Sequence, residues 1–371
     1  MTDLSRLDTP CLVVDREKVE ANAARLKARL KKLGVPLRLH VKTAKSLEAA
    51  ALVLEGKKDP ITVSTLKEAE QFYGDGKNAG GYRDILYAVG FAPNKLERAR
   101  ALQKRGCNLT LLTDNVDTAR AISGFPVLIE IDTDGHRAGI KPEGAELIPV
   151  AKALREAGNT VAGVLTHAGA SYDLDTSAAL RAMAEQERSG AVRAAQRLRD
   201  AGFDAPTVSV GSTPTAHSAE NLDGVTEVRA GVFVFFDLVM AGVGVCKIDD
   251  IALSVLTTVI GHQKEKNQIL VDAGWMALSR DRGTAKQKVD QGYGLVCDAD
   301  GKPIPDLIVS DTNQEHGIVS RRGGGPVLEL PVGTLLRVLP NHACATAAQH
   351  DRYSVSASGE KIKIWRRFGG W

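Results

Sequence analysis

Cysteine is scarce in this chain of 371 residues: there are five, widely separated, and no two of them form a Cys-x-x-Cys motif. An odd, scattered set argues against a disulfide framework and predicts reduced thiols. Long apolar runs are also lacking, and the first ten residues carry neither a basic segment nor an apolar one. We therefore expect no membrane association and a cytoplasmic location.

The chain has no excess of either charge sign. Lys and Arg number 48 and Asp and Glu 45, and no basic run is interleaved with aromatic residues. The electrostatic signature of a nucleic-acid-binding protein is therefore missing, and a small molecule is the expected partner. With 43% hydrophobic and 25% charged residues the chain has the composition of a globular protein, and its length predicts two domains.

Short runs rich in Val, Ile and Leu alternate with segments of helical period in the first two thirds of the chain, which predicts βα units and a parallel sheet. The predicted strands are LRLHV, ITVS, ILYAV, LTLLT, VLIEI, AGVLTH, TVSVG and EVRAGV. Eight strands close a (β/α)8 TIM-like barrel, which we assign to residues 16–245. An open doubly wound sheet is the alternative, but no Gly-x-Gly-x-x-Gly motif follows the first strand.

The rest of the chain has a different texture. Residues 246–371 contain β-rich runs separated by Gly, Pro and Asp turns, with little helical period. An early strand at 11–15 precedes a long amphipathic helix at about 16–33 and is a candidate to pair with these runs. The sequence thus predicts a second, all-β domain made of residues 1–15 and 246–371.

Lys42 ends the first barrel strand on the face opposite to the apolar side chains, so we expect it to point into the barrel mouth, where barrel enzymes place their chemistry. Burial favours the neutral, nucleophilic form of a lysine, which then forms a Schiff base with a carbonyl cofactor. The strand alone favours a plainer interpretation, an inward lysine that neutralises a carboxylate. Lys45, beyond the strand, is expected to begin the next helix.

The loop after the seventh strand, GSTPT, combines Gly211, Ser212 and Thr213 with a proline. Free backbone N–H groups, hydroxyl donors and a proline in the first helical turn are the features of a phosphate-binding turn, and barrel phosphate sites favour the loops after strands seven and eight. Gly231 supplies the second loop and allows close backbone approach. An ordinary capped helix start explains GSTPT equally well. Together with Lys42, these loops indicate pyridoxal phosphate.

Three further side chains at strand ends are candidates to contact a planar cofactor. Arg137 follows the fifth strand, and an arginine beside a pyridine nitrogen keeps that nitrogen unprotonated; a salt bridge to Asp132 or Asp134 is the alternative. His167 and Tyr172 follow the sixth strand and are able to stack on the ring or hydrogen-bond to it, although a lone histidine is more often a core residue.

Near the end of the chain, LPNHACAT places His342 and Cys344 two residues apart. On a strand, such residues share a face, so both donors reach one ion. Thiolate and imidazole together suit zinc, and two protein ligands leave positions open for water and substrate. Taken alone, a pair of this kind is more often structural than metal-binding.

Several stretches, in order along nearly the whole chain, resemble the D-serine dehydratase and D-threonine aldolase family of pyridoxal phosphate enzymes, which have an alanine racemase-like fold. They are LDTPCLVVD, LHVKTAKS, ITVSTLKEAEQF, IEIDTDGHRAG, LTHAGASYD, SVGSTPT, VRAGVFVFFD, NQEHG and LPNHACAT. The resemblance implies Lys42 as the Schiff-base lysine, GSTPT as the phosphate binder, and His342 and Cys344 as zinc ligands, because the dehydratases carry His-x-Cys where the aldolases carry His-x-Asp. Around the lysine, family members have PHVKTHK or PHAKAHK, whereas this chain has Leu39 and Ala44.

The resemblance further implies a homodimer and a dehydratase that converts a D-3-hydroxy amino acid, of the D-threo-3-hydroxyaspartate or D-serine type, to a 2-oxo acid and ammonia. Three alternatives remain. Retro-aldol cleavage gives glycine and an aldehyde. Racemisation needs a second base on the opposite face. A non-catalytic pyridoxal phosphate carrier protein normally has no second β domain, so the β-rich C-terminal part argues against it.

Overall fold

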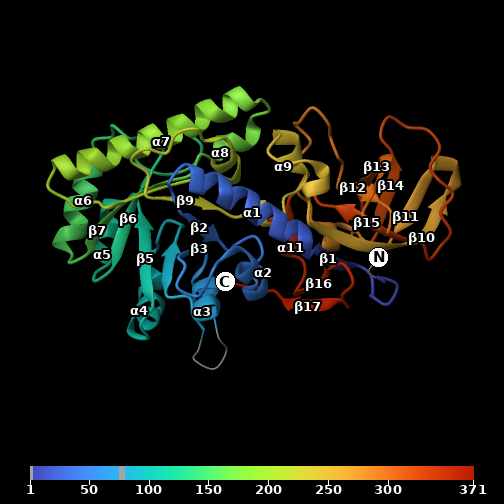
Figure 1. Cartoon of the computed structure of the whole chain (residues 1–371), viewed down its shortest axis with the longest axis horizontal. Helices are drawn as coiled ribbons and strands as arrows, with labels where there is room; N and C mark the ends of the chain where they lie inside the picture. Colours follow the sequence, from blue (N-terminus) through green and yellow to red (C-terminus); the bar gives the residue numbers. More distant parts are fainter. Residues whose placement is uncertain (1–2, 75–79) are drawn as a thin grey trace. The chain divides into compact units, whose positions relative to one another are not determined.

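The computed structural model describes residues 3–74 and 80–371, which form two compact units (Figure 1). One unit contains residues 23–231 and the last two residues; the other contains residues 232–369 and the N-terminal segment up to residue 22. Every helix in the described part of the chain is too short or too polar to span a bilayer.

The first unit is a closed parallel barrel in which each strand pairs with the next and β9 pairs with β2. All eight predicted strands are present, which confirms the (β/α)8 barrel. The strands are β2 (Leu37–His40), β3 (Ile61–Val63), β4 (Asp84–Tyr87), β5 (Asn108–Thr113), β6 (Pro126–Ile131), β7 (Thr160–Thr166), β8 (Thr207–Val210) and β9 (Glu227–Ala230).

Helices follow the barrel strands, and many begin where a side chain caps the first turn. They are α2 (Leu47–Val53), α3 (Leu66–Tyr73), α4 (Leu96–Lys104), α5 (Val116–Ala121), α6 (Leu147–Glu156), α7 (Ser177–Asp200) and α8 (Thr213–Ser218). The side-chain oxygen of the residue before α2, α3, α5, α7 and α8 accepts a hydrogen bond from a backbone N–H of the first turn. Serine, threonine and asparagine serve this role because their short side chains reach the unpaired N–H groups.

The barrel contains both an apolar and a polar region. Its apolar cluster consists of Leu86, Leu112, Leu128 and Leu165. The polar region is a chain of contacts in which Arg38 pairs with Glu227 (2.7 Å), Glu227 accepts a hydrogen bond from Ser209 (2.6 Å), and Ser209 accepts one from Arg229 (2.8 Å). Arg229 also donates to the backbone oxygen of Thr166 at the end of β7 (2.5 Å). Buried charges on β2 and β9 are thus paired with each other and anchored to the strand ends.

The second unit is built on a nine-stranded sheet in the order β11-β14-β13-β12-β15-β10-β1-β16-β17. Its strands are β1 (Cys11–Asp15), β10 (Leu253–Gln263), β11 (Gln268–Val271), β12 (Leu295–Cys297), β13 (Pro303–Thr312), β14 (Gly317–Arg321), β15 (Leu335–Leu339), β16 (Arg352–Ser356) and β17 (Lys363–Arg366). Strand β1 runs antiparallel to β10 and parallel to β16, so the N-terminal strand belongs to this sheet, as the sequence indicated. Short helices α9 (Leu238–Val243), α10 (Trp275–Leu278) and α11 (Ala343–Ala347) accompany it.

The two units meet at 22/23 and 231/232, whereas the sequence predicted boundaries at 15/16 and 245/246. Helix α1 (Arg16–Lys32) begins in the β unit, where Asn22 donates to the backbone oxygen of Asp250 (2.9 Å). The segment after Gly231 also belongs to the β unit, because Leu238 and Ala252 bond through their backbones to Pro340 and Phe235 respectively. These contacts join residues that are distant in the sequence, so local sequence patterns do not indicate where one unit ends and the other begins.

Candidate active site

The sequence placed Lys42 at the end of the first barrel strand, but β2 ends at His40 and Lys42 lies beyond it, in a tight turn. Residues 41–44 form this turn, closed by a hydrogen bond from the N–H of Lys45 to the oxygen of Val41 (2.8 Å). Helix α2 begins only at Leu47, after its cap Ser46, so the prediction that Lys45 begins the helix is wrong. Lys45 has a left-handed backbone (φ 45°), which ends the turn before the helix starts.

The two lysines of this turn differ in their partners. Lys45 pairs with Glu68, which is 1% exposed, at 3.1 Å. Lys42 is half-buried and forms no ion pair with any carboxylate in residues 3–74 and 80–371. The plainer interpretation of an inward lysine, neutralising a carboxylate, therefore describes Lys45 and not Lys42.

The positive charge of Lys42 affects the pKa of two histidines, His167 and His40. Burial lowers the pKa of His167 to about 3, and the positive charge of Lys42 adds to the effect. Burial followed by the charges of Lys42 and Arg229 also lowers the pKa of His40 well below its ordinary value. Both rings are therefore neutral at neutral pH, and the Nδ1 atom of His40 is buried with no hydrogen-bond partner in the described part of the chain.

The predicted phosphate loop follows β8. Ser212 caps α8 in a capping box: its side chain accepts from the N–H of Thr215 (3.2 Å), and its own N–H donates to the Thr215 hydroxyl (3.0 Å). The hydroxyl of Thr213 is buried and has no hydrogen-bond partner among the described residues. A buried, unpaired hydroxyl carries a desolvation cost that a bound acceptor removes.

A buried glutamate on α7 joins the loops after β7 and β8. The Oε1 atom of Glu187 accepts the N–H groups of Ala168 (2.9 Å) and Gly211 (3.1 Å), and burial raises the pKa of this carboxyl group. Ser171 adds a second link through its hydroxyl to that of Ser212 (2.9 Å). Sequence reasoning missed Glu187 because a glutamate in a charge-rich helix normally faces solvent.

Arg137, His167 and Tyr172 gather at the ends of β6 and β7. Arg137 forms an ion pair with Glu130 (3.5 Å) and not with Asp132 or Asp134, the predicted partners. The charge of Arg137 contributes to the lowered pKa of His167. The rings of His167 and Tyr172 lie 6.2 Å apart between centroids, and His167 Nδ1 is 3.0 Å from the backbone oxygen of Gly211. The barrel thus brings the predicted cofactor residues together on neighbouring loops.

Both predicted loop glycines are required by close backbone packing. A Cβ at Gly231 would lie 2.7 Å from the backbone oxygen of His40 and 3.2 Å from the Thr43 hydroxyl, so this glycine fits against the lysine turn. At Gly211, a Cβ would lie 2.2 Å from the backbone oxygen of Arg229, and the backbone φ is +132°. Neither position accepts a side chain without movement of the neighbouring strand.

Replacing Gly211 with alanine is expected to destabilise the fold more than the same change at Gly202. Gly202 also has a positive φ (+81°) but nothing within 4 Å of its Cβ position, so Gly202→Ala reports backbone strain of about 1 kcal/mol. Gly211→Ala adds an overlap with Arg229, which costs a further ~1–3 kcal/mol. Chemical denaturation of the cofactor-free proteins measures both values, and equal losses would contradict the packing argument.

The second predicted site lies in the β unit, and its backbone differs from the expectation. We predicted that His342 and Cys344 share a face of a strand, but β15 ends at Leu339, His342 is the N-cap residue of α11, and Cys344 lies inside that helix. The strand premise is therefore wrong: Pro340 follows the last β residue and the chain turns into the helix. The two side chains nevertheless contact each other, because a hydrogen bond joins them.

Asp281, which sequence reasoning missed, anchors the histidine. Its Oδ2 atom lies 2.7 Å from His342 Nδ1. Burial, the largest single influence, lowers the pKa of His342, but the hydrogen bonds to Asp281 and Cys344 outweigh it and raise the value to about 11. In residues 3–74 and 80–371, no group of three or more His, Cys, Asp or Glu side chains has the geometry of a metal site. The candidate metal ligands are therefore His342 and Cys344 alone, and Asp281 contacts His342.

Comparisons with known proteins agree with this architecture. The family model "Alanine racemase, N-terminal domain" matches residues 14–239, and a serine dehydratase domain model matches residues 252–356. The chain is 52% identical to D-threo-3-hydroxyaspartate dehydratase of Delftia sp. (strain HT23), over 99% of both chains, and 30% identical to D-serine dehydratase of Dictyostelium discoideum, over 97% and 96%.

Solved structures show the same likeness. The Delftia dehydratase superposes with a TM-score of 0.96 at 51% identity, covering both chains completely. A cysteine-to-alanine mutant of that enzyme, described as metal-free, superposes equally well. A D-threonine aldolase from Filomicrobium marinum has a TM-score of 0.79 at 22% identity, covering 98% of this chain and 96% of its own, and shares the fold.

A (β/α)8 barrel followed by a mainly antiparallel β domain, with a lysine just beyond the first barrel strand, is the architecture of an alanine racemase-like enzyme. Within this class, the chain belongs to the D-serine dehydratase and D-threonine aldolase family, as the sequence motifs indicated. It is accordingly a lyase of a pyridoxal phosphate-dependent family that acts on a small molecule.

Proposed function

We propose that the protein is a dehydratase that converts D-threo-3-hydroxyaspartate to a 2-oxo acid and ammonia, with D-serine as a weaker substrate. The observation that carries this proposal is the contact between His342 and Cys344, the donor pair of the dehydratase branch, in a chain 52% identical to a D-threo-3-hydroxyaspartate dehydratase. The net change is loss of water across the Cα–Cβ bond, followed by hydrolysis of the enamine product to the 2-oxo acid and ammonia.

The barrel residues fit pyridoxal phosphate. Among the described residues, Lys42 pairs with no carboxylate and the buried Thr213 hydroxyl has no hydrogen-bond partner. The neutral His167 ring offers a face or an edge to a planar heterocycle. We propose that Lys42 holds the cofactor aldehyde, that Gly211, Ser212, Thr213 and Gly231 surround its phosphate, and that Arg137, His167 and Tyr172 contact its ring. When bound, the cofactor supplies an electron sink for the bond that breaks at Cα.

The proton at Cα is removed by this chain's own side chain. We assign that step to the Lys42 amine, which would accept the proton and which pairs with no carboxylate among the described residues. Arg137 bears a fixed positive charge beside the ring and so limits protonation of the ring nitrogen. Neutral His167 remains hydrogen-bonded to the loop of Gly211 and so keeps the loops after β7 and β8 in place.

The β unit fits a metal ion of borderline softness. Imidazole and thiolate are ligands that zinc prefers, and two protein ligands leave positions for water and the substrate hydroxyl. We propose zinc on His342 and Cys344, where it would supply a Lewis acid for the poor leaving group, hydroxide. Asp281 holds the Nδ1 atom of the His342 ring, and zinc at the other ring nitrogen would take the place of the proton that the ring carries without the metal.

Removing the Thr213 hydroxyl is expected to weaken cofactor binding without destabilising the protein. Thr213→Val keeps the shape and deletes one hydrogen bond to a charged group, worth about 1.5–3 kcal/mol, so the dissociation constant should rise about tenfold to hundredfold. Thr62→Val is the matched control, because the Thr62 hydroxyl is likewise buried without a partner in the described chain. Equilibrium titration of the apoprotein with pyridoxal phosphate measures both, and equal affinities would contradict the phosphate assignment.

A panel of D-amino acids, scored for ammonia and for aldehyde, tests the proposed function. We expect the specificity constant for D-threo-3-hydroxyaspartate to exceed that for D-serine and for D-threonine, with ammonia as the nitrogen product. A higher specificity constant for D-serine would overturn the substrate assignment. Aldehyde and glycine as products would instead identify a retro-aldolase, the activity in the names of the family's aldolase members.

We also propose a cytoplasmic homodimer. None of the five cysteines, all of which lie in the described part of the chain, forms a disulfide, which is typical of a reducing compartment. The dimer rests on the resemblance to the family alone. Sedimentation analysis of the purified protein measures the oligomeric state.

A further inference from the structure

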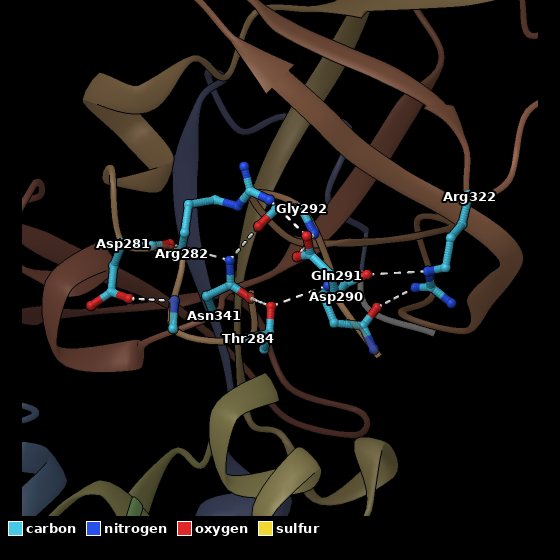
Figure 2. Close-up of polar contacts among 9 residues, drawn as sticks. Asp281, Arg282, Thr284, Asp290, Gln291, Gly292, Arg322 and Asn341 are labelled. Atoms are coloured by element: carbon cyan, nitrogen blue, oxygen red, sulfur yellow. Dashed lines mark hydrogen bonds and ion pairs between the residues drawn. The ribbon is translucent and has the colours of Figure 1, made fainter. Parts of the chain in front are cut away.

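The segment between α10 and β12 carries Asp281 and contacts the two residues that precede α11, Asn341 and His342. Figure 2 shows the contacts of this segment with Asn341. The Asp281 carboxylate contacts the His342 ring (2.7 Å), and the Asp281 backbone oxygen accepts a hydrogen bond from the Asn341 side chain (3.2 Å). Consecutive residues of one segment therefore hold both the side chain and the backbone of a single aspartate.

Asn341 closes this segment into a loop. Its Nδ2 atom also donates to the backbone oxygen of Gly292 (2.6 Å), and its Oδ1 atom accepts the hydroxyl of Thr284 (2.8 Å). The Thr284 oxygen in turn accepts the N–H of Gln291 (3.1 Å). Asn341 and Thr284 are 3% and 0% exposed, so this network is shielded from water and its geometry is well defined.

Both carboxylate oxygens of Asp281 are engaged. Oδ1 accepts the N–H of Gly283 (2.8 Å), while Oδ2 faces His342. A carboxylate fixed in this way has its direction set by the protein before any ligand arrives. The Asp281 carboxylate contacts only the Nδ1 atom of the His342 ring. This contact fixes the orientation and the tautomer in which the ring presents its other nitrogen, Nε2.

The outer side of the loop is stabilised by weaker, more exposed contacts. Arg282 pairs with Asp290 (2.8 Å), and Arg322 donates to the Gln291 side chain (2.5 Å) and to the Asp290 backbone oxygen (3.2 Å). Solvent-exposed pairs of this kind contribute little to stability. Asp290 therefore offers a matched control in the same loop: an Asp→Asn change there removes a charge without touching the histidine.

We infer that Asp281 is the positioning residue for His342 and that Asn341 positions Asp281, so that the loop prepares the histidine to bind a metal. This inference rests on the proposed metal site and assigns Asp281 the role of a hydrogen-bond acceptor behind the ligand, not of a ligand itself. Removal of a residue that hydrogen-bonds to a metal ligand typically lowers metal affinity by about 10–100-fold.

Zinc affinity of the full-length protein, stripped of metal and titrated against a chromophoric chelator, tests the inference without reference to turnover. Asp281→Ala should weaken zinc binding about 10–100-fold and Asp281→Asn about tenfold, because asparagine keeps an acceptor oxygen but loses the charge. Asn341→Ala should weaken it to a smaller extent, and Asp290→Asn should leave it unchanged. The absorbance of bound pyridoxal phosphate should be the same in all variants.

Cobalt supplies a second readout that loss of folding does not imitate. The ligand-field spectrum of the Co²⁺-loaded protein should retain thiolate charge transfer in Asp281→Asn but change in shape, because the imidazole is less firmly oriented. Unchanged zinc affinity and an unchanged cobalt spectrum in Asp281→Asn would overturn the inference. Zinc binding lost as completely in Asp281→Ala as in His342→Ala would also overturn it, because Asp281 would then be a ligand.

The two proposals fail in different ways. If His342→Ala and Cys344→Ala bind zinc as tightly as the unmodified protein, the metal site itself is wrong, and the role of Asp281 falls with it. If those two variants lose zinc while Asp281→Asn and Asp281→Ala do not, the metal site stands and only the positioning role is wrong.

Discussion

Lys42→Ala should eliminate both turnover and the visible absorbance of bound pyridoxal phosphate. Of the two lysines that follow β2, only Lys42 lacks a carboxylate partner in the described chain, so no other group of the turn replaces its amine. Loss of a group that both binds the cofactor and transfers the proton is expected to lower kcat by at least about 10³. Absorbance spectra and ammonia release at saturating cofactor measure the two effects.

Lys45→Gln is the control for this prediction. Lys45 is committed to the buried Glu68, so its replacement should reduce thermal stability while the absorbance of the cofactor remains. Reduction with borohydride followed by peptide mapping should locate the cofactor on Lys42. Cofactor recovered on Lys45 would refute the assignment.

Replacing either member of the metal pair should stop elimination but leave the cofactor in place. His342 and Cys344 belong to the β unit, whereas the predicted cofactor residues belong to the barrel unit, so the absorbance of bound pyridoxal phosphate should persist in His342→Ala and Cys344→Ala. Lewis-acid assistance is worth several kcal/mol, and its loss should lower the rate of ammonia release by about 10³ or more. Exchange of the α-proton with solvent should be partly retained, because the metal acts on the leaving group.

Metal depletion and rescue supply the control. A chelator should reproduce the defect in the unmodified protein, and added zinc should restore its activity but not that of the two variants. Cys344→Asp creates the His-x-Asp pair of the aldolase branch, so its metal preference should move from zinc towards manganese or magnesium. Ammonia release at the full rate by the stripped protein would show that the pair is structural.

The barrel was predictable because its signals are local. Each strand is a short apolar run between turn signals. The alternation along LRLHVK extended the first strand too far, because β2 ends at His40 and Lys42 lies in the turn that follows. The early strand at 11–15 was open to both domains from periodicity alone, and its pairing with β10 and β16 places it in the β unit. The fold class and the eight barrel strands thus follow from pattern and the family resemblance, whereas the strand order of the second sheet was not predicted.

The supporting residues were not predictable from the same signals. Glu187 and Asp281 contact loops that are distant in sequence, and nothing in the local composition of α7 or of the segment after α10 distinguishes them from solvent-exposed acids. The expected strand at 342–344 failed for another reason: Pro340 and the alanine-rich ACATA segment favour a turn and a helix, which local propensity indicates once β15 ends.

The products formed from D-threo-3-hydroxyaspartate test the central claim most directly. The protein with pyridoxal phosphate and zinc should release one ammonia for each oxaloacetate formed, with no glycine, because water is lost across the Cα–Cβ bond and that bond stays intact. Chromatography of the reaction mixture, with enzymatic assay of ammonia and oxaloacetate, gives the ratio. Glycine and glyoxylate in equal amounts, without ammonia, would show that the Cα–Cβ bond is cleaved and that the protein is an aldolase.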